Sequence, residues 1–416
     1  MEEIFNMEGS LFKEIMKLTK STTTEKQIPL EPHLAFCYSM FMKDLQSILF
    51  VKASKIPSIL FGADSHNKTI SAVKQYLGLD ELLDAFCVLW CVARALDTVG
   101  FLLIVTEDDP TVPSELKVSI LKNFHCHIYD RDLPFSCGTK HHKVLMDQYH
   151  HVSTALLELQ KGYQNSIENT IKTMGAGMAK FIQKEVETVD DYNEYCHSVE
   201  GIVFLEMSKH LHASDFEDLT SDNLSNSMGL LFQKVHFIED FFDDINEIPK
   251  GGRIYWPRQI WSKYVDKPEE LTHKENSKKA VCCLNDMVTD ALSHVVDCLE
   301  YLSTLGHSGI FQLYGIGQII AIGTLSSCYN NIEVFRRSRV RMSPGQWAKV
   351  GLGTNATSGF YEAIYGFSTT LKAKIDSNDP NATKTLRCVK EIQKVCEDSG
   401  LLNQRFDRSS PFQLHL

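Results

Sequence analysis

Carboxylates at helical spacing are the residues of this sequence that most directly suggest chemistry. Asp240 and Asp244 are four residues apart, with Asp243 beside them. On a helix, residues four apart share one face. Carboxylate oxygens suit Mg2+, which usually takes one or two protein carboxylates together with substrate phosphates. A solvated acidic surface explains the same spacing. However, these acids interrupt the apolar segment 227–245, where unpaired carboxylates are costly, so a metal site and an acidic surface are about equally good interpretations of this helix alone.

A second acidic group strengthens the metal interpretation. Asp97 ends the apolar segment 79–99, and Glu107, Asp108 and Asp109 follow shortly after it. Two acidic groups, each attached to an apolar helical segment, suggest a paired clamp in which Mg2+ is held over a diphosphate. We therefore predict that the two acidic segments face each other.

The elements that must position these acids are predicted to be helices. Apolar residues recur at helical spacing or fill whole segments, whereas Pro (12) and Gly (23) fall mostly between them. No alternating pattern typical of strands reaches a useful length. No linker separates two halves, so the sequence predicts an all-α, single-domain protein. The main predicted helices are 79–99, 144–172, 227–245, 278–304 and 310–329.

Composition excludes several classes of protein. The formal net charge of −11 argues against a broad nucleic-acid-binding surface. The twelve cysteines include no CxxC pair, so the usual spacing of a structural zinc site is absent. The amino terminus is acidic and lacks an apolar core, which excludes a signal peptide. No run approaches the ~18 consecutive apolar residues of a membrane span, so the chain is expected to be soluble.

Long segments of the sequence resemble squalene synthase of the plant type. The resemblance extends over about 25–405, which leaves 1–24 and 406–416 as terminal extensions of the predicted domain. The most extensive matching segments are KVSILKNFHCHIYDRD (117–132), VLMDQYHHVSTALLEL (144–159), MGAGMAKFIQKEVETVDDYNEYCH (174–197), CLNDMVTDAL (283–292) and AIGTLSSCYNNIEVFR (321–336).

This resemblance implies an isoprenoid-synthase helical bundle with a central cavity, and a specific reaction. Two farnesyl diphosphates would be condensed to presqualene diphosphate, which NADPH would then reduce to squalene. Tyr195 matches the tyrosine assigned to proton transfer; judged without the resemblance, it is a core tyrosine with a satisfied hydroxyl. The residues implied to bind Mg2+ are Asp97, Glu107, Asp108, Asp240, Asp243 and Asp244.

The resemblance also implies how the substrate and the cofactor are bound and where the protein is located. The residues implied to bind the diphosphate and NADPH are Arg94, Arg341, Ser47, Gln233 and Arg253. The family is anchored to the cytosolic face of the endoplasmic reticulum membrane by an apolar carboxyl-terminal segment. The sequence shows no such anchor, so a cytosolic location is the alternative expectation.

A seven-residue insert interrupts the first acidic motif. The family motif is a continuous DTVEDD, whereas here residues 100–106, GFLLIVT, separate DTV from EDD. A heptad is nearly two helical turns and drifts by only ~20°. A continuous helix would keep Asp97 and Asp108 on one face but separate them by ~16 Å of rise, compared with the ~4 Å between ions in two-metal sites. A loop would expose the apolar GFLLIV run, so we predict that the helix continues.

Other departures from the family pattern lie at charged or polar positions. Gln46 and Ser343 replace basic residues, Glu239 reverses a charge, and His236 puts a softer ligand in a position suited to magnesium. The main alternative is therefore a catalytically impaired paralogue that still binds isoprenoid diphosphate or a protein partner. An enzyme that stops at presqualene diphosphate, because NADPH contacts are lost, is a third possibility.

Overall fold

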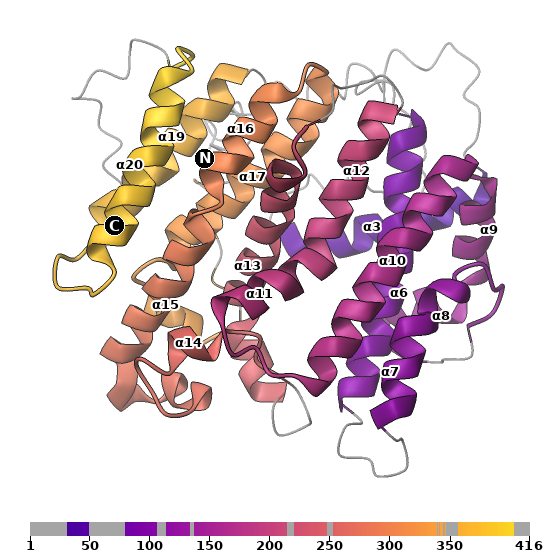
Figure 1. Ribbon diagram of the computed structural model, residues 1–416, viewed down its shortest axis with the longest axis horizontal. Coiled ribbons are helices and arrows are strands. Elements are labelled where there is room, and N and C mark those ends of the chain that lie inside the picture. The colour runs from indigo at the N-terminus through magenta and orange to yellow at the C-terminus, as the bar shows by residue number, and fades with distance from the viewer. Residues whose placement is uncertain are drawn as a thin grey trace, which may run out of the picture. The chain divides into compact units, whose positions relative to one another are not determined.

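The computed structural model describes residues 31–49, 80–105, 114–133, 137–213, 220–247, 253–338, 340, 342–343, 346 and 357–402. Within these ranges every regular element is a helix (Figure 1), which confirms the all-α prediction. The helices group into two compact units, one within Phe12–Lys184 and one within Glu185–Leu416. The single domain over 25–405 stays a prediction, and the extensions 1–24 and 406–416 lie outside the described residues.

The amino-terminal unit is built around one apolar helix, α6 (Asp80–Val105). Leu82, Val88, Val92, Leu96 and Val99 of this helix are all buried, which confirms the buried helix predicted over 79–99. Neighbouring helices contact α6 on several sides, and α10 runs alongside it (Figure 1). The other elements of the unit are α3 (Pro32–Leu49), α7 (Ser114–Asn123), the 3-10 helix η1 (Phe124–Cys126), α8 (Lys140–Asp147), α9 (His150–Glu158) and α10 (Lys161–Gln183).

The carboxyl end of α6 carries the seven-residue insert. The helix continues without interruption from Gly100 to Val105, so the predicted helix extension is confirmed as far as that residue. At ~1.5 Å of rise per residue, Val105 stands about 12 Å beyond Asp97 along the axis. Gly100 is buried against Met178 of α10, and a Cβ at this position would collide with the methionine side chain. The first residue of the insert is therefore packed within the helix.

Two of the predicted helices are broken. The segment predicted over 144–172 forms parts of α8, α9 and α10. The break between α9 and α10 occurs because Leu159 and Gln160 adopt extended ψ angles of 156° and 147°. The Gln164 side chain stabilises this break, since its Nε2 donates to the carbonyls of Leu157 (3.1 Å) and Leu159 (2.8 Å). These carbonyls lie where a helix end leaves acceptors without intrahelical partners.

The prediction of one helix over 278–304 is also wrong, since it divides into α15 (Ser277–Leu292) and α16 (Val295–Thr304). At this break the Ser293 hydroxyl donates to the Asp290 carbonyl over 2.6 Å. Serine side chains offer the backbone such local alternatives to continuing a helix. Apolar spacing carries no information about these side chain–backbone bonds, so it predicted continuous helices.

The carboxyl-terminal unit is centred on α13 (Asp222–Glu247), which contacts most of the longer helices around it. The helices predicted over 227–245 and 310–329 are confirmed as parts of α13 and α17. The other elements are α11 (Val189–Cys196), the π-helical segment η2 (His197–Gly201), α12 (Ile202–Ala213), α14 (Arg258–Trp261), η4 (Pro268–Thr272), η5 (Lys274–Asn276), α15, α16, α17 (Ser308–Cys328), η6 (Ile332–Phe335), α19 (Thr357–Ala373) and α20 (Ala382–Asp398).

One helix of the described part, α17, is long and apolar enough to cross a membrane by length and composition. Of its most apolar window, 61% is buried inside the protein, as in the core helix of a soluble protein. A hollow of about 560 Å3 lies beside it, lined by residues of α16, α17 and α19. None of the residues predicted to bind substrate or cofactor lines this hollow.

Candidate functional site

The second acidic motif lies on the last turns of α13, and aromatic packing holds these turns in place. The indole Nε1 of Trp256 donates to the Phe237 carbonyl over 2.9 Å. The Phe241 ring, one turn further along, packs on Trp256 at 4.3 Å and on Phe335 at 5.0 Å between ring centroids. Phe237 and Phe241 are buried in the core, which fixes the rotation of the helix, and Asp240 and Asp244 follow them by three residues on the adjoining part of its surface.

The acids themselves are half-buried. Asp240 and Asp244 share a helical face, and Asp243 lies at its margin. The Ser338 hydroxyl donates to Oδ2 of Asp243 over 2.6 Å. Within the described ranges, no three His, Cys, Asp or Glu side chains gather closely enough to hold a metal by themselves. One or two carboxylates are nevertheless what Mg2+ usually takes from a protein, with the other ligands coming from water and substrate phosphates, so the carboxylates on α13 fit this ion by their chemistry.

Tyr195 belongs to a wall of three aromatic rings in the same unit. Its ring stacks on Tyr255, with centroids 4.4 Å apart and planes 11° from parallel. Phe237 completes the wall, 5.9 Å from Tyr195 and 5.2 Å from Tyr255. Aromatic faces attract cations through their quadrupole. Tyr195, which is 7% exposed, therefore belongs to a cluster of aromatic rings of the kind that attracts positive charge.

A buried charge network lies behind this wall. The Lys234 ammonium, on α13, donates to Oδ2 of Asp290 over 2.6 Å and contacts Nε2 of His294 at 2.8 Å. It also lies 5.2 Å above the ring of Tyr192. Burial, and secondarily the Lys234 charge, lower the pKa of His294 to about 3. His294 is therefore neutral near pH 7 and can accept a hydrogen bond from Lys234. Sequence reasoning missed this network, although a lysine within an apolar helix was a usable signal.

The carboxyl-terminal unit contains several of the predicted binding residues. Gln233 is buried and precedes Lys234, and the half-buried Arg253 lies two residues before Tyr255. His236 and Glu239, the altered positions of the motif, are half-buried on α13. The carboxyl-terminal unit thus contains Tyr195, Gln233, Arg253 and the three acids of the second motif.

The first acidic motif lies in the amino-terminal unit, on α6. Arg94 and Asp97 form an ion pair of 3.5 Å, and the Arg94 guanidinium also lies 5.4 Å over the ring of Trp90. Trp90 in turn packs edge-on against Phe41 of α3, 5.6 Å away. Arg94 is therefore held between an aromatic ring and a carboxylate, and a guanidinium is the group whose planar set of donors matches phosphate oxygens.

Four of the predicted site residues lie wholly or partly outside the described part of the structure. Glu107, Asp108 and Arg341 lie outside the described residues. Ser47 belongs to α3, but its side chain is likewise outside the described part. The two acidic motifs belong to different units, so the prediction that they face each other stays a prediction.

Comparisons with known proteins point in one direction. The family model for squalene/phytoene synthase matches residues 65–346. Squalene synthase 1 of Panax ginseng is 55% identical over 381 residues, which are 92% of this chain and 84% of that protein. Squalene synthase of Nicotiana benthamiana is 54% identical over 381 residues, 92% of this chain and 85% of its own length. A solved complex of TcSQS with a ligand matches with a TM-score of 0.74 and 31% identity, over 88% of this chain and 99% of that chain.

Proposed function

The chain belongs to the squalene/phytoene synthase family, and we propose on this basis how its described residues carry out the family's chemistry. The protein is a squalene synthase-type farnesyltransferase with the all-α isoprenoid-synthase fold. In this reaction, two farnesyl diphosphates condense to presqualene diphosphate with loss of one diphosphate. Reduction by NADPH with loss of the second diphosphate then forms squalene.

The observation that carries the proposal is the placement of acids and aromatic rings on one scaffold. Asp240 and Asp244 extend from the same helix, α13, that contributes Phe237 to the wall behind Tyr195. Departure of diphosphate from an allylic carbon leaves a carbocation, and the electron pair of the broken carbon–oxygen bond adds one negative charge to the already anionic diphosphate. The acids would hold Mg2+, which when bound stabilises the charge on the leaving diphosphate. The aromatic faces would stabilise the cation.

The remaining predicted residues complete the proposed site. Tyr195 would transfer the proton released when the new carbon–carbon bond forms. Arg94, held by Trp90 and Asp97, would bind phosphate oxygens, and Gln233 and Arg253 would contribute further donors. On the resemblance alone, we assign Asp97, Glu107 and Asp108 to Mg2+ and Ser47 and Arg341 to the diphosphate or NADPH.

We also propose an association with the cytosolic face of the endoplasmic reticulum membrane, as expected from the family. The apolar products and the water-soluble diphosphate substrate meet most readily at such an interface. Fractionation of cells that express the chain tests this location, since recovery of all the protein in the cytosolic fraction would contradict it and favour the alternative location.

A product assay tests the proposed function. Purified protein is incubated with farnesyl diphosphate, Mg2+ and NADPH, and formation of squalene is the expected outcome. Asp240→Asn and Asp244→Asn should each abolish most turnover, because each removes a carboxylate from the proposed metal site. Asp222→Asn is the matched control, since Asp222 is an exposed acid in the first turn of the same helix. Absence of any isoprenoid product from the wild-type protein would overturn the proposal.

The continuation of α6 to Val105 favours one alternative function, an impaired paralogue that binds isoprenoid diphosphate without turning it over. This helix rises by about 12 Å between Asp97 and Val105, before the acids that follow the insert in the sequence. Binding of farnesyl diphosphate without product would support this alternative, whereas presqualene diphosphate as the only product would indicate that reduction alone is lost.

A further inference from the structure

We propose that Ser338 is a positioning residue for the acidic face of α13, and that its hydroxyl selects Mg2+ over larger divalent cations there. The inference rests on the proposed function, because it assumes that Asp243 contributes to the site that binds Mg2+ and diphosphate. It adds a residue that the acidic motif does not contain, 95 positions away in the sequence.

The contact between the two side chains is short and directional. The Ser338 hydroxyl donates to Oδ2 of Asp243 over 2.6 Å, within the range of strong hydrogen bonds from a hydroxyl to a carboxylate. With Oδ2 occupied by this donor, Oδ1 is the oxygen best placed to bind a cation. The hydroxyl therefore favours monodentate binding by Asp243.

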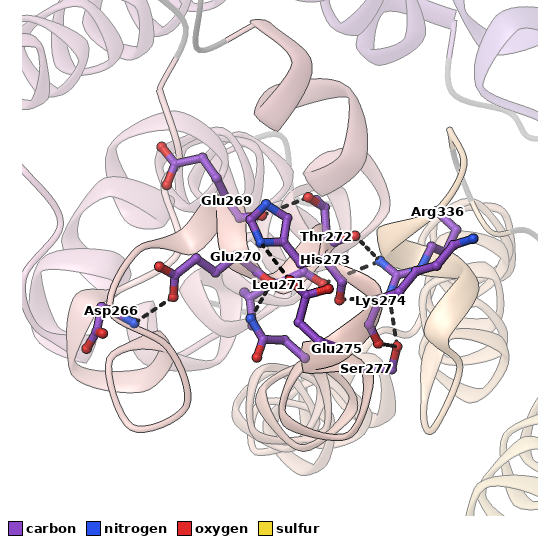
Figure 2. Close-up of polar contacts among 11 residues, drawn as sticks. Asp266, Glu269, Glu270, Leu271, Thr272, His273, Lys274, Glu275, Ser277 and Arg336 are labelled. Atoms are coloured by element: carbon purple, nitrogen blue, oxygen red, sulfur yellow. Dashed lines mark hydrogen bonds and ion pairs between the residues drawn. The ribbon is translucent and has the colours of Figure 1, made fainter.

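Ser338 is exposed, so it can keep this hydrogen bond only if its backbone is held in place. Arg336, two residues earlier in the chain, helps to hold it. Its guanidinium donates to carbonyl oxygens of η4 and of the residue that follows it, Thr272 (2.6 Å) and His273 (3.3 Å), and to the Ser277 hydroxyl (3.0 Å). Figure 2 shows the Arg336 side chain with its guanidinium directed toward the oxygens of these residues. Helix ends leave such carbonyls without intrahelical partners, and the rigid planar fork of arginine can satisfy several at once.

The other side of the segment is fixed by packing. Phe335, which immediately precedes Arg336, is buried against Phe241 of α13 and against Trp256, at 5.0 and 6.0 Å between ring centroids. The Asn331 side chain accepts from the backbone N–H of Glu333 over 3.1 Å and caps η6. Residues 331–336, which precede Ser338, thus contact both α13 and the η4–η5 region. The register of Ser338 relative to Asp243 is set by these contacts.

Monodentate binding has a consequence for cation choice. Mg2+ is small and requires near-ideal octahedral geometry, which a monodentate carboxylate satisfies. Ca2+ accepts six to eight oxygens and readily takes both oxygens of a carboxylate. Removing the Ser338 hydroxyl would free Oδ2 of Asp243 and allow bidentate binding. The site should then lose preference for Mg2+ relative to Ca2+.

The test measures cation binding rather than turnover. Isothermal titration calorimetry follows Mg2+ and, separately, Ca2+ binding to the full chain in the presence of inorganic diphosphate. Ser338→Ala should weaken Mg2+ binding about 10-fold, the lower end of the effect of removing a partner that orients a metal ligand, and weaken Ca2+ binding less. Ser338→Thr keeps the hydroxyl and should retain the wild-type ratio of the two affinities.

The neighbouring arginines supply a matched pair. Arg336→Met should reproduce the loss of Mg2+ preference, because it releases the segment that carries Ser338. Arg337→Met is the control, since Arg337 is exposed and forms its ion pair with Glu333 of its own segment (3.3 Å). Thermal denaturation of each variant verifies that it is folded.

Several results would overturn the inference. One is an unchanged affinity of Ser338→Ala for Mg2+, and another is an equal loss of affinity for Mg2+ and Ca2+ in this variant. A third is the absence of Mg2+ binding to the wild-type protein in the presence of diphosphate. The outcome is separable from that of the proposed function. Wild-type protein that binds Mg2+ and diphosphate with the expected Ser338 dependence but forms no isoprenoid product would overturn only the proposed function. Squalene formation with cation binding indifferent to Ser338 would overturn only this inference.

Discussion

The ring of Tyr195 lies face to face with that of Tyr255, with centroids 4.4 Å apart and planes only 11° from parallel. Stacking of this kind fixes the orientation of a ring and adds roughly 0.5–1.5 kcal/mol beyond the area it buries. Tyr255 therefore orients the side chain proposed to transfer the proton, although Tyr255 belongs to no motif that the sequence suggested.

Substitution at Tyr255 should accordingly impair turnover. Tyr255→Leu is expected to lower kcat for product formation by up to about tenfold, equivalent to about 1.4 kcal/mol, because the ring of Tyr195 loses its stacking partner. Tyr255→Phe keeps the stack and should retain most of the activity. Steady-state assays with farnesyl diphosphate measure both, and equal rates for the Leu and Phe variants would show that stacking has no role.

Removal of the insert from α6 should raise activity. Deleting residues 100–106 takes out nearly two helical turns, so the face presented by the helix is almost preserved. Asp97 would then be followed directly by EDD, as in the family motif. The rate of farnesyl diphosphate consumption by the deletion variant is the measurement, and a rate no higher than that of the wild-type protein contradicts the prediction. Sequencing of the transcript separately determines whether the seven codons are expressed.

Gly229 allows α13 to approach the π-helical segment η2 closely. A Cβ at this position would lie 2.5 Å from the carbonyl oxygen of Glu200 and from the backbone nitrogen of Gly201, and neither backbone atom can yield easily. Gly229→Ala should therefore lower the free energy of unfolding by about 1–3 kcal/mol, as other overpacking substitutions do. Urea denaturation followed by circular dichroism measures the change.

Gly366 provides the control for this substitution. It lies within α19, and a Cβ there would meet nothing within 4 Å. Gly366→Ala should stabilise the protein by roughly 0.5–1 kcal/mol, because alanine loses less backbone entropy in a helix. Similar effects at the two positions would contradict the proposed close approach at Gly229.

The half-buried His294, in contact with Lys234, predicts a specific loss of stability in acid. The pKa of His294 is about 3 in the folded protein, well below its ordinary value of 6.5. Between pH 3 and pH 6.5, His294 is therefore protonated in the unfolded chain but neutral in the folded protein. The full contribution to stability is therefore present above pH 6.5 and is lost progressively as the pH falls toward 3. The slope from one such group reaches about 1.4 kcal/mol per pH unit.

His294→Gln removes the titrating group while its amide oxygen can still accept from Lys234. The difference in the free energy of unfolding between wild-type and variant proteins should thus shift in favour of the variant as the pH falls from 6.5 to 4. Chemical denaturation at a series of pH values measures this difference. A constant difference across the range would show that His294 is protonated to the same extent in both states.

The sequence by itself determined the class of fold and the helical face that Asp240 and Asp244 share. The almost continuous apolar character of 79–99 predicted the buried helix that is part of α6, and its continuation as far as Val105 followed from the apolar residues of the insert. The common face of Asp240 and Asp244 required only helical spacing. These conclusions depend on local geometry, which neighbouring residues specify directly.

Only the tertiary structure decided which distant groups meet. The breaks after Leu159 and Leu292 depend on side chains that satisfy helix ends, and apolar spacing does not encode them. The contacts of Tyr195 with Tyr255, Lys234 with Asp290, and Ser338 with Asp243 each join segments that are separate in the chain. Such contacts arise when helices pack and bring buried polar and aromatic groups to the partners they require. Helical period therefore predicts which face a residue occupies, while packing determines what that face contacts.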